Sequence, residues 1–209
     1  MIKEEKMNLR EKIWKTMEEK NIARFPLPPY HRIPNYEGSD EAAEKVRELE
    51  EYQKAQVIVS NPDYAQKKVR EIILRDNKML IMASPRLRHG YLEIDPNKVK
   101  GKEDFASTIE GAFKYGKRLE ELPKPDLIVT GCVAVDREGN RLGKGGGYGD
   151  KEITSIKSKF GKIPVITTVH DVQIVDKVPT EKGDTKVDII VTPKIIIRVG
   201  SNPTSNIPI

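Results

Sequence analysis

The sequence predicts an α/β protein with a three-layer αβα fold, in which a mostly parallel sheet is covered by helices on both faces. Short apolar runs such as 56–60, 78–84 and 126–135 are typical of strands that are buried on both sides. Amphipathic segments lie between these runs, and this alternation is the usual pattern of βαβ units. Neither a repeat nor a linker divides the 209 residues. We therefore expect a single domain over 1–200 and a loose tail over 201–209.

The first helix is expected over residues 3–22. Leu9, Ile13 and Met17 recur there at a spacing of four residues, which places them on one apolar stripe. This helix should end before the proline-rich stretch 25–34, because proline interrupts regular backbone hydrogen bonding. We expect that stretch to form an extended strap over the body of the domain.

The remaining elements follow from the same patterns. Further helices are expected over 39–54, from a start at Asn61 and Pro62, over 103–121, and along the face marked by Ile153, Ile156 and Phe160. Strands are expected over 56–60, 78–84, 126–135, 164–170, 187–193 and 194–199.

The composition excludes several classes of protein. Cys132 is the single cysteine, so an internal disulfide cannot form and a reducing compartment is expected. No apolar run reaches the roughly 20 residues that cross a bilayer, and the charged start 1–12 lacks the apolar core of a signal peptide. We therefore expect a cytoplasmic protein. The net charge of +5 is spread over 37 basic and 32 acidic residues, which favours a solvated surface over an RNA-binding face.

Residues 141–150 read RLGKGGGYGD, and glycine at this density suggests either an anion site or a tight turn. Gly145 stands where a Walker loop needs Ser or Thr, and Tyr148 stands where a dinucleotide fingerprint needs its third glycine. Glycines still allow backbone amides to approach a phosphate, and a following helix adds its positive end. Arg141 and Lys144 supply charge, and the carboxylate of Asp150 can hold a divalent cation. The alternative is an ordinary loop from strand to helix that Asp150 caps.

Two further segments end predicted strands, where ligands bind in open α/β sheets. The segment SPRLRHG offers Arg86 and Arg88 as an anion site, and a solvated basic loop is the alternative. His170 ends the strand 164–170 and could donate a hydrogen bond to a substrate, and a structural role is the alternative.

Several separated segments carry a family resemblance. They are KMNLR with Lys6 and Arg10, FPLPPYHRIPNYEGS, SPRLRHG, GCVAVDREGNRLGKGGGYGD, VITTVHDVQIVD and VDIIVTP. In this order, over about 6–199, the chain resembles the 5-formyltetrahydrofolate cyclo-ligases, also called methenyltetrahydrofolate synthetases. It is most similar to the branch of methenyltetrahydrofolate synthetase domain-containing proteins. The resemblance implies an αβα fold of the NagB/RpiA/CoA-transferase type.

The resemblance also implies a reaction that needs ATP and Mg²⁺. In that family, ATP phosphorylates the formyl oxygen of 5-formyltetrahydrofolate, N10 attacks the activated carbon, and loss of phosphate gives 5,10-methenyltetrahydrofolate. By position, the resemblance assigns to the ATP phosphates the residues Lys6, Arg10, Arg141 and Lys144, and to the cradle around those phosphates Gly143, Gly145, Gly146 and Gly147. It assigns Asp150 to the metal, and Lys144 and Tyr148 to catalysis. The residues that it assigns to the substrate are Tyr148, Arg86, Arg88 and His170. The implied partners are ATP and a reduced folate or analogue. We expect no membrane or nucleic-acid partner, and a monomer or small homo-oligomer.

The chain departs from the family at two places. Gly149 stands where the family has a second tyrosine, and positions 64–66 lack the glutamate that recognises the pterin. Two alternatives to the enzyme therefore stay open. The first is a non-folate paralogue that keeps the nucleotide pocket as a binding or regulatory module, with RNA as a possible partner. The second is a protein that no longer binds ATP.

Overall fold

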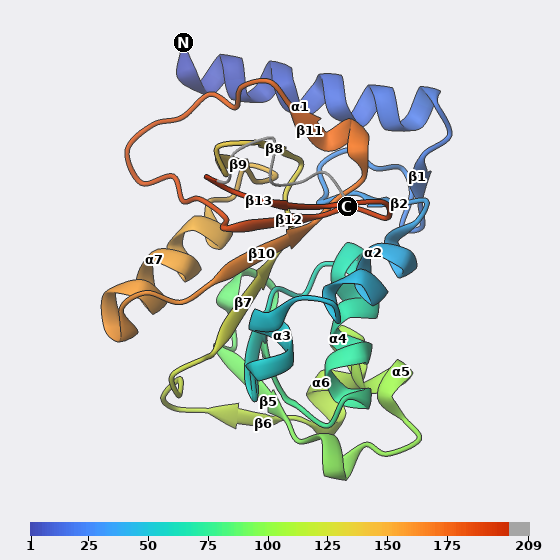
Figure 1. The fold of residues 1–209 in the computed structure, drawn as a ribbon, viewed down its shortest axis with the longest axis vertical. Coiled ribbons are helices and arrows are strands. Elements are labelled where there is room, and N and C mark those ends of the chain that lie inside the picture. The colour runs from blue at the N-terminus through green and yellow to red at the C-terminus, as the bar shows by residue number, and fades with distance from the viewer. Residues whose placement is uncertain (201–209) are drawn as a thin grey trace.

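The computed structural model describes residues 1–200, and the tail expected over 201–209 lies outside the described residues. An eight-stranded sheet forms the middle of the molecule, with the order β13-β12-β10-β7-β3-β4-β5-β6 (Figure 1). Neighbouring strands are parallel from β12 to β4, whereas β13 at one edge and β5 and β6 at the other end of the sheet are antiparallel to their neighbours. The strands are β3 (Val57–Ser60), β4 (Met79–Ala83), β5 (Tyr91–Ile94), β6 (Lys117–Leu119), β7 (Leu127–Thr130), β10 (Val165–Thr168), β12 (Ile189–Val191) and β13 (Ile196–Arg198).

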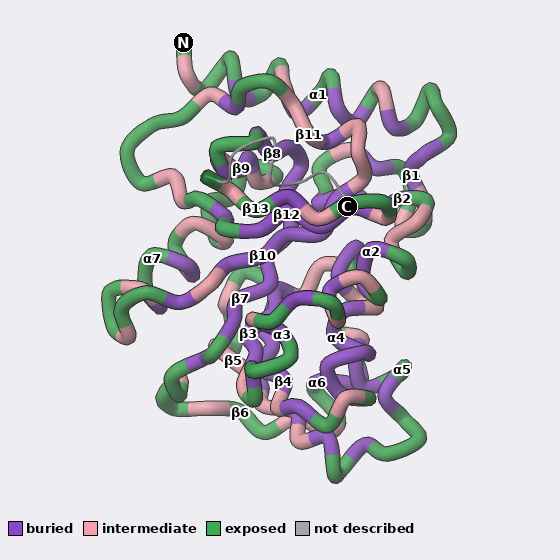
Figure 2. The backbone as a smooth tube through the Cα atoms, viewed as in Figure 1, coloured by how far each residue is buried: buried purple, intermediate pink, exposed green. Residues whose placement is uncertain are grey.

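Helices cover both faces of this sheet, which confirms the three-layer prediction. One face packs against α2 (Ser39–Val46), α3 (Glu50–Lys54), α4 (Lys67–Arg75), α5 (Glu103–Ala106) and α6 (Ile109–Tyr115), and the other packs against α7 (Tyr148–Phe160). Alternation along the strands produces the two apolar faces: Ile58 clusters with Ile72 of α4, whereas its neighbour Val59 clusters with Ile153 of α7. The central strands are accordingly buried (Figure 2).

A smaller unit of structure joins the long helix α1 (Ile2–Glu19) to the edge of the domain. A three-stranded sheet of order β11-β8-β9 lies beside α1 (Figure 1), and its strands are β8 (Ala134–Asp136), β9 (Arg141–Leu142) and β11 (Ile174–Val175). The segment 25–34 joins β1 (Ala23–Arg24) to β2 (Asn35–Tyr36) without a helix or strand of its own. Trp14 of α1 is buried and donates a hydrogen bond to the Arg32 carbonyl at 3.0 Å, so this strap packs under the helix.

Two predicted helices are interrupted. The helix expected over 39–54 is broken between α2 and α3, because Leu49 adopts an extended backbone and buries its side chain. The segment expected as a helix over 103–121 divides into α5, α6 and β6. Thr108 begins α6 by accepting a hydrogen bond from the Gly111 amide at 2.9 Å, which starts a new helix instead of continuing α5.

The helix start expected at Asn61 and Pro62 is wrong. A 3₁₀ helix over Tyr64–Gln66 follows instead, and α4 begins at Lys67. Nη1 of the buried Arg70 donates to the carbonyl oxygens of Asn61 and Asp63, which holds this segment at the end of β3 rather than in α4.

The strand expected over 126–135 is two strands that belong to different sheets. β7 ends at Thr130, and β8 begins at Ala134. The chain leaves the large sheet at Gly131, where a Cβ would lie only 2.6 Å from Oε1 of Gln66 and 2.7 Å from Cγ2 of Ile33. No helix within residues 1–200 is both long and apolar enough to cross a membrane.

Candidate functional site

A cavity of about 1210 Å³ opens at the carboxyl ends of β3, β7 and β4. Asn61, Thr130 and Ser84 follow or end these three neighbouring parallel strands and line the cavity. This is the edge at which ligands bind in open α/β sheets. The start of α1, the glycine-rich loop 143–147 and the segment 181–184 contribute the remaining walls.

The glycine-rich loop connects β9 to α7. Gly145 and Gly147 have φ values of +121° and +76°, which lie in the left-handed region that favours glycine. Gly147 is the residue before the first turn of α7, a helix of 13 residues. The loop is therefore a tight turn that presents backbone amides and the positive end of a helix to the cavity.

Two cations of α1 reach this loop from a distant part of the sequence. Nζ of Lys6 lies 2.8 Å from Oε1 of Glu181 and 2.8 Å from Oδ2 of Asp184. Nε of Arg10 donates to the Gly143 carbonyl oxygen at 2.7 Å. Both side chains are mostly buried and line the cavity, and their four-residue spacing places them on one face of α1.

The surroundings of these two cations shift their pKa values in opposite directions. Burial lowers the pKa of Lys6, but hydrogen bonds to Asp184 and Glu181 outweigh burial, so the net pKa lies above its usual value. Burial lowers the pKa of the Arg10 guanidinium below its usual value, although Asp184 and Asp150 oppose that shift. Lys6 is therefore held as a cation by acidic partners.

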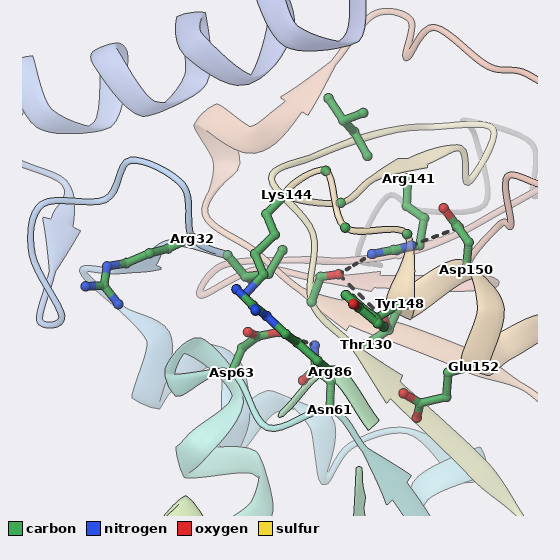
Figure 3. A pocket seen from close by; sticks show the side chains of 18 of the residues that line it. Arg32, Asn61, Asp63, Arg86, Thr130, Arg141, Lys144, Tyr148, Asp150 and Glu152 are labelled. Carbon is green, nitrogen blue, oxygen red and sulfur yellow. Dashed lines mark hydrogen bonds and ion pairs between the residues drawn. The ribbon is translucent and has the colours of Figure 1, made fainter. Parts of the chain in front are cut away.

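Arg141 forms the floor beneath the loop and is joined to Asp150 (Figure 3). Its Nη1 donates to Oδ1 of Asp150 at 3.0 Å, and its Nη2 donates to the Gly131 carbonyl oxygen at 2.8 Å. The amide and hydroxyl of Thr185 donate to the same Oδ1, at 3.0 and 2.6 Å. Asp150 therefore links the start of α7 to β9 and to the segment after residue 184.

Gly149 has a contact that the sequence does not suggest. A Cβ at this position would lie 3.0 Å from Nη2 of Arg141 and 3.2 Å from its Nη1. Glycine here leaves space for the guanidinium to lie flat against the first turn of α7. The position at which the family resemblance expects a second aromatic ring is therefore occupied in part by Arg141.

Other predicted residues divide between the cavity and its surroundings. Lys144, Tyr148 and Arg86 are exposed at the cavity wall, and Figure 3 shows Lys144 extending toward Asp63 and Arg86. Arg88 follows Arg86 in the same turn but does not line the cavity. His170 also lies outside it. Its Nδ1 accepts a hydrogen bond from the Val172 amide at 3.1 Å, and its ring packs edge-on against Tyr36.

Several charged or polar residues that line this cavity were not predicted as site residues, among them Asn61, Asp63, Arg70 and Glu152. Each lies in or beside a segment that reads as amphipathic, where a charged residue is usually solvated. Burial raises the pKa of Asp63, against the opposing charges of Lys144, Arg70 and Arg141. The sequence does contain a sign that Glu152 is buried, because this residue directly precedes Ile153 and Ile156, which form the buried face of α7.

Burial also raises the pKa of Glu152 to about 8, with a further contribution from the charge of Asp63 and an opposing one from Arg141. Glu152 is 7% exposed, and within residues 1–200 its carboxyl group has no hydrogen bond or ion pair. Burial lowers the pKa of Arg70 to about 10, so this guanidinium stays charged at neutral pH.

Asp150 is the predicted metal ligand, and its chemistry suits a cation that arrives with phosphates. Mg²⁺ is commonly held by one or two carboxylate oxygens together with phosphate oxygens and water. The described residues contain no group of three His, Cys, Asp or Glu that could hold a metal without such help. Oδ1 of Asp150 accepts three hydrogen bonds, whereas no hydrogen bond within the described chain occupies Oδ2. One carboxylate oxygen thus remains for the cation.

Comparisons with known proteins agree with this architecture. The chain is 39% identical to the methenyltetrahydrofolate synthase domain-containing protein of Bos taurus over 206 residues, which cover 93% of this chain and 54% of that protein. It therefore spans about half the length of this relative. The 5-formyltetrahydrofolate cyclo-ligase of Escherichia coli is 36% identical over 72 residues, which cover 34% of this chain and 38% of that protein.

A solved structure shows the same fold. The NMR structure of 5,10-methenyltetrahydrofolate synthetase from Aquifex aeolicus matches with a TM-score of 0.60 and 20% identity, over 94% of each chain. The model of the 5-formyltetrahydrofolate cyclo-ligase family matches residues 2–193. Because this match includes α1, the glycine-rich loop and the whole large sheet except β13, the chain belongs to the 5-formyltetrahydrofolate cyclo-ligase family.

Proposed function

We propose that this chain binds ATP with Mg²⁺ and converts 5-formyltetrahydrofolate to 5,10-methenyltetrahydrofolate. One observation carries the proposal: Lys6, Arg10 and Arg141 come from distant segments and converge with the glycine-rich loop on a single cavity. Its volume of about 1210 Å³ exceeds the range of roughly 300–1,000 Å³ that is usual for one small ligand. The cavity can therefore hold a nucleotide and a second molecule together.

The nucleotide phosphates fit the cationic end of the cavity. The amides of Gly145, Gly146 and Gly147 and the start of α7 supply donors, and the Gly143 carbonyl oxygen holds Arg10 beside the loop. Lys144 is exposed at the cavity wall, so its ammonium group can reach a phosphoryl group there. Lys6 is held by Glu181 and Asp184 until a phosphate competes for it, which keeps its charge directed toward the cavity.

Asp150 would hold Mg²⁺ through its remaining carboxylate oxygen. The cation supplies charge neutralisation on the phosphate oxygens when it is bound. Arg141 orients Asp150 through the 3.0 Å hydrogen bond to Oδ1, and Thr185 restrains the same oxygen. These contacts fix the carboxyl group before any ligand arrives.

The reaction needs positioning and charge neutralisation more than a protein acid or base. The formyl oxygen takes the γ-phosphoryl group and ADP leaves. N10 then forms a bond to the formyl carbon and gives its proton to solvent or phosphate, and the carbon–oxygen bond breaks as phosphate leaves. Lys144 would follow the transferred group, and Tyr148, at the start of α7, would separate the nucleotide from the pterin. Arg86 would contact the acidic part of the substrate from the far wall.

A turnover assay tests this proposal. The purified chain with ATP, Mg²⁺ and 5-formyltetrahydrofolate is expected to produce the near-ultraviolet absorbance of the methenyl product, and omission of either ATP or Mg²⁺ should abolish it. Lys6→Met is expected to weaken ATP binding about 10- to 100-fold, because it removes one charge-assisted contact. Lys12→Met, on the exposed face of the same helix, is the matched control. Absence of product, while the Escherichia coli cyclo-ligase is active in the same assay, contradicts the proposal.

Gly149 also allows a direct test of the nucleotide end. Gly149→Ala is expected to weaken ATP binding about threefold to tenfold, because its Cβ would press on the Arg141 guanidinium at 3.0 Å. In the absence of ligand, stability should change by less than about 1 kcal/mol, since alanine favours helix. Isothermal titration with ATP measures the effect, and Ser155→Ala on the exposed side of α7 is the control. Equal ATP affinities for the two variants would show that the Arg141 guanidinium does not contribute to phosphate binding.

A second function is favoured by Gly149 and by the absence of an acidic residue at positions 64–66. In this alternative the chain is a binding or regulatory module that keeps the nucleotide site without the folate reaction. ATP would then raise the melting temperature, whereas 5-formyltetrahydrofolate would leave it unchanged. An RNA partner belongs to this alternative only.

A further inference from the structure

The segment between β11 and β12 runs beside the first half of α1 (Figure 1) and contributes to the cavity wall. It is anchored at both ends, because the buried residues Val178 and Val187 donate backbone hydrogen bonds to the β8–β9 hairpin. Between these anchors, residues 180–183 are exposed. Two acids of this stretch, Glu181 and Asp184, line the cavity. The segment therefore places two carboxylates at the cationic end of the site.

Both carboxylates face the cations of α1. Nζ of Lys6 donates to Oε1 of Glu181 at 2.8 Å and to Oδ1 of Asp184 at 3.0 Å. The charge of Asp184 also acts on Arg10, which lies one turn farther along the helix and opposes the effect of burial on the Arg10 pKa. Two positive groups are thus offset by two negative ones. A phosphate gains little from Lys6 in this arrangement unless one of the acids leaves.

The two acids are held to different degrees. The Asp184 side chain is 16% exposed, and its Oδ2 also accepts a hydrogen bond from the Glu181 amide at 2.9 Å. The Glu181 side chain is 54% exposed, and within the described chain its carboxylate pairs with Lys6 alone. A carboxylate that solvent already reaches returns to water at little cost. Glu181 can therefore leave while Asp184 keeps Lys6 directed at the cavity.

We propose that Glu181 is an internal competitor for the nucleotide phosphates: its carboxylate occupies the position on Lys6 that a phosphate oxygen takes, and it leaves when the nucleotide binds. This rests on the proposed function, and it identifies a residue that lowers the affinity for the nucleotide. The competing ligand is a polyphosphate, because several negative charges compensate for the release of one carboxylate. A ligand with a single carboxylate only exchanges one like charge for another at Lys6.

Such a competitor suits a reaction that must release ADP after each turnover. Glu181 is tethered three residues before Asp184, so it stays at a high local concentration beside Lys6. As the phosphates leave, the carboxylate takes up the ammonium group again, and the charge of Lys6 no longer holds the product. Removal of the carboxylate should therefore strengthen the binding of ADP as well as that of ATP.

The experiment measures binding by isothermal titration to the full chain and to Glu181→Gln. The three probes are ATP with Mg²⁺, ADP with Mg²⁺, and inorganic tripolyphosphate. Glu181→Gln is expected to tighten the binding of all three about threefold to fivefold, because glutamine removes the competing charge of an ion pair that solvent reaches. Glu138→Gln, an exposed glutamate outside the cavity, is the matched control and should leave the three affinities unchanged.

A double-mutant cycle shows whether the effect passes through Lys6. In the Lys6→Met background, Glu181→Gln should change each affinity less than about twofold, because the cation for which the carboxylate competes is absent. An equal gain in both backgrounds would overturn the proposal, since Glu181 would then act by general repulsion. Weaker binding by Glu181→Gln would also overturn it. The single variant still decides the sign of the effect if Lys6→Met is unstable.

The outcomes separate this inference from the proposed function. If Glu181→Gln tightens ATP binding through Lys6 but no methenyl product forms, the competitor stands and the cyclo-ligase proposal fails. If product forms and Glu181→Gln leaves the ATP affinity unchanged, the cyclo-ligase proposal stands and this inference fails. If neither ATP nor tripolyphosphate binds the unmodified chain or Glu181→Gln, both fail.

Discussion

Replacing Arg70 by methionine is expected to lower the free energy of unfolding by about 3–5 kcal/mol. Arg70 is 1% exposed, and its guanidinium donates to three backbone carbonyl oxygens: those of Asn61 at 2.9 Å, Asp63 at 2.8 Å and Ser107 at 2.9 Å. Methionine fills a similar volume but supplies no donor. The variant therefore loses the link between the end of β3, α4 and the junction of α5 with α6, and it leaves Asp63 with less compensating charge.

Arg75→Met is the matched control, because Arg75 lies on the same helix and receives the same substitution. Its side chain is half-exposed and pairs with Glu71 at 3.3 Å and Glu103 at 3.6 Å. Glu71 is buried but keeps Lys67 and Lys68 as partners, and the Arg75 guanidinium is in contact with solvent, so this variant should lose less than about 1 kcal/mol. Urea unfolding at neutral pH measures both values. Similar losses for the two variants would show that the buried guanidinium contributes no more than a surface one.

The large sheet could be predicted from the sequence because its inner strands are apolar without interruption. The runs around β3, β4, β7, β10 and β12 are buried on both faces, and their order along the chain with intervening helices already implies a parallel sheet. The strands β5 and β6 were not predicted, because their residues are only partly buried and their short sequences lack a continuous apolar run.

The breaks in the predicted elements arise from contacts between distant residues. The chain leaves β7 at Gly131 because Gln66 and Ile33 occupy the space where a side chain would lie. The segment Asn61–Asp63 is held out of α4 by Arg70. Neither contact can be derived from a local pattern, since each joins residues that only the folded chain brings together.

The candidate site shows the same division. The glycine-rich loop could be found from its composition, and Lys6 and Arg10 from the resemblance to the family. Arg70 could not be found, because a buried arginine within an amphipathic helix cannot be told from a solvated one by its sequence neighbours. His170 was predicted at the end of a strand, but β10 ends at Thr168 and the histidine side chain caps the following 3₁₀ turn.

The roles of Asp150 in structure and in metal binding can be separated by substitution. Asp150→Asn is expected to weaken binding of ATP in the presence of Mg²⁺ about 100-fold, which corresponds to about 2.7 kcal/mol. The asparagine oxygen can still accept the hydrogen bonds from Thr185, but the charge that the cation requires is lost. ATP binding measured in EDTA should change less than threefold, because the phosphate contacts of Lys6, Arg10 and the glycine-rich loop do not involve Asp150.

Thr185→Val is the control for the structural role, since it removes the 2.6 Å hydrogen bond to Oδ1 and leaves the carboxylate charge in place. Its affinity for ATP should stay within about threefold of the unmodified chain, both with Mg²⁺ and in EDTA, because Asp150 keeps its charge and still accepts hydrogen bonds from Arg141 and from the Thr185 amide. The decisive quantity is the ratio of the affinities with Mg²⁺ and in EDTA. If Asp150→Asn lowers both affinities equally, Asp150 acts only by orienting Arg141, and the cation is held by the phosphates without a protein carboxylate.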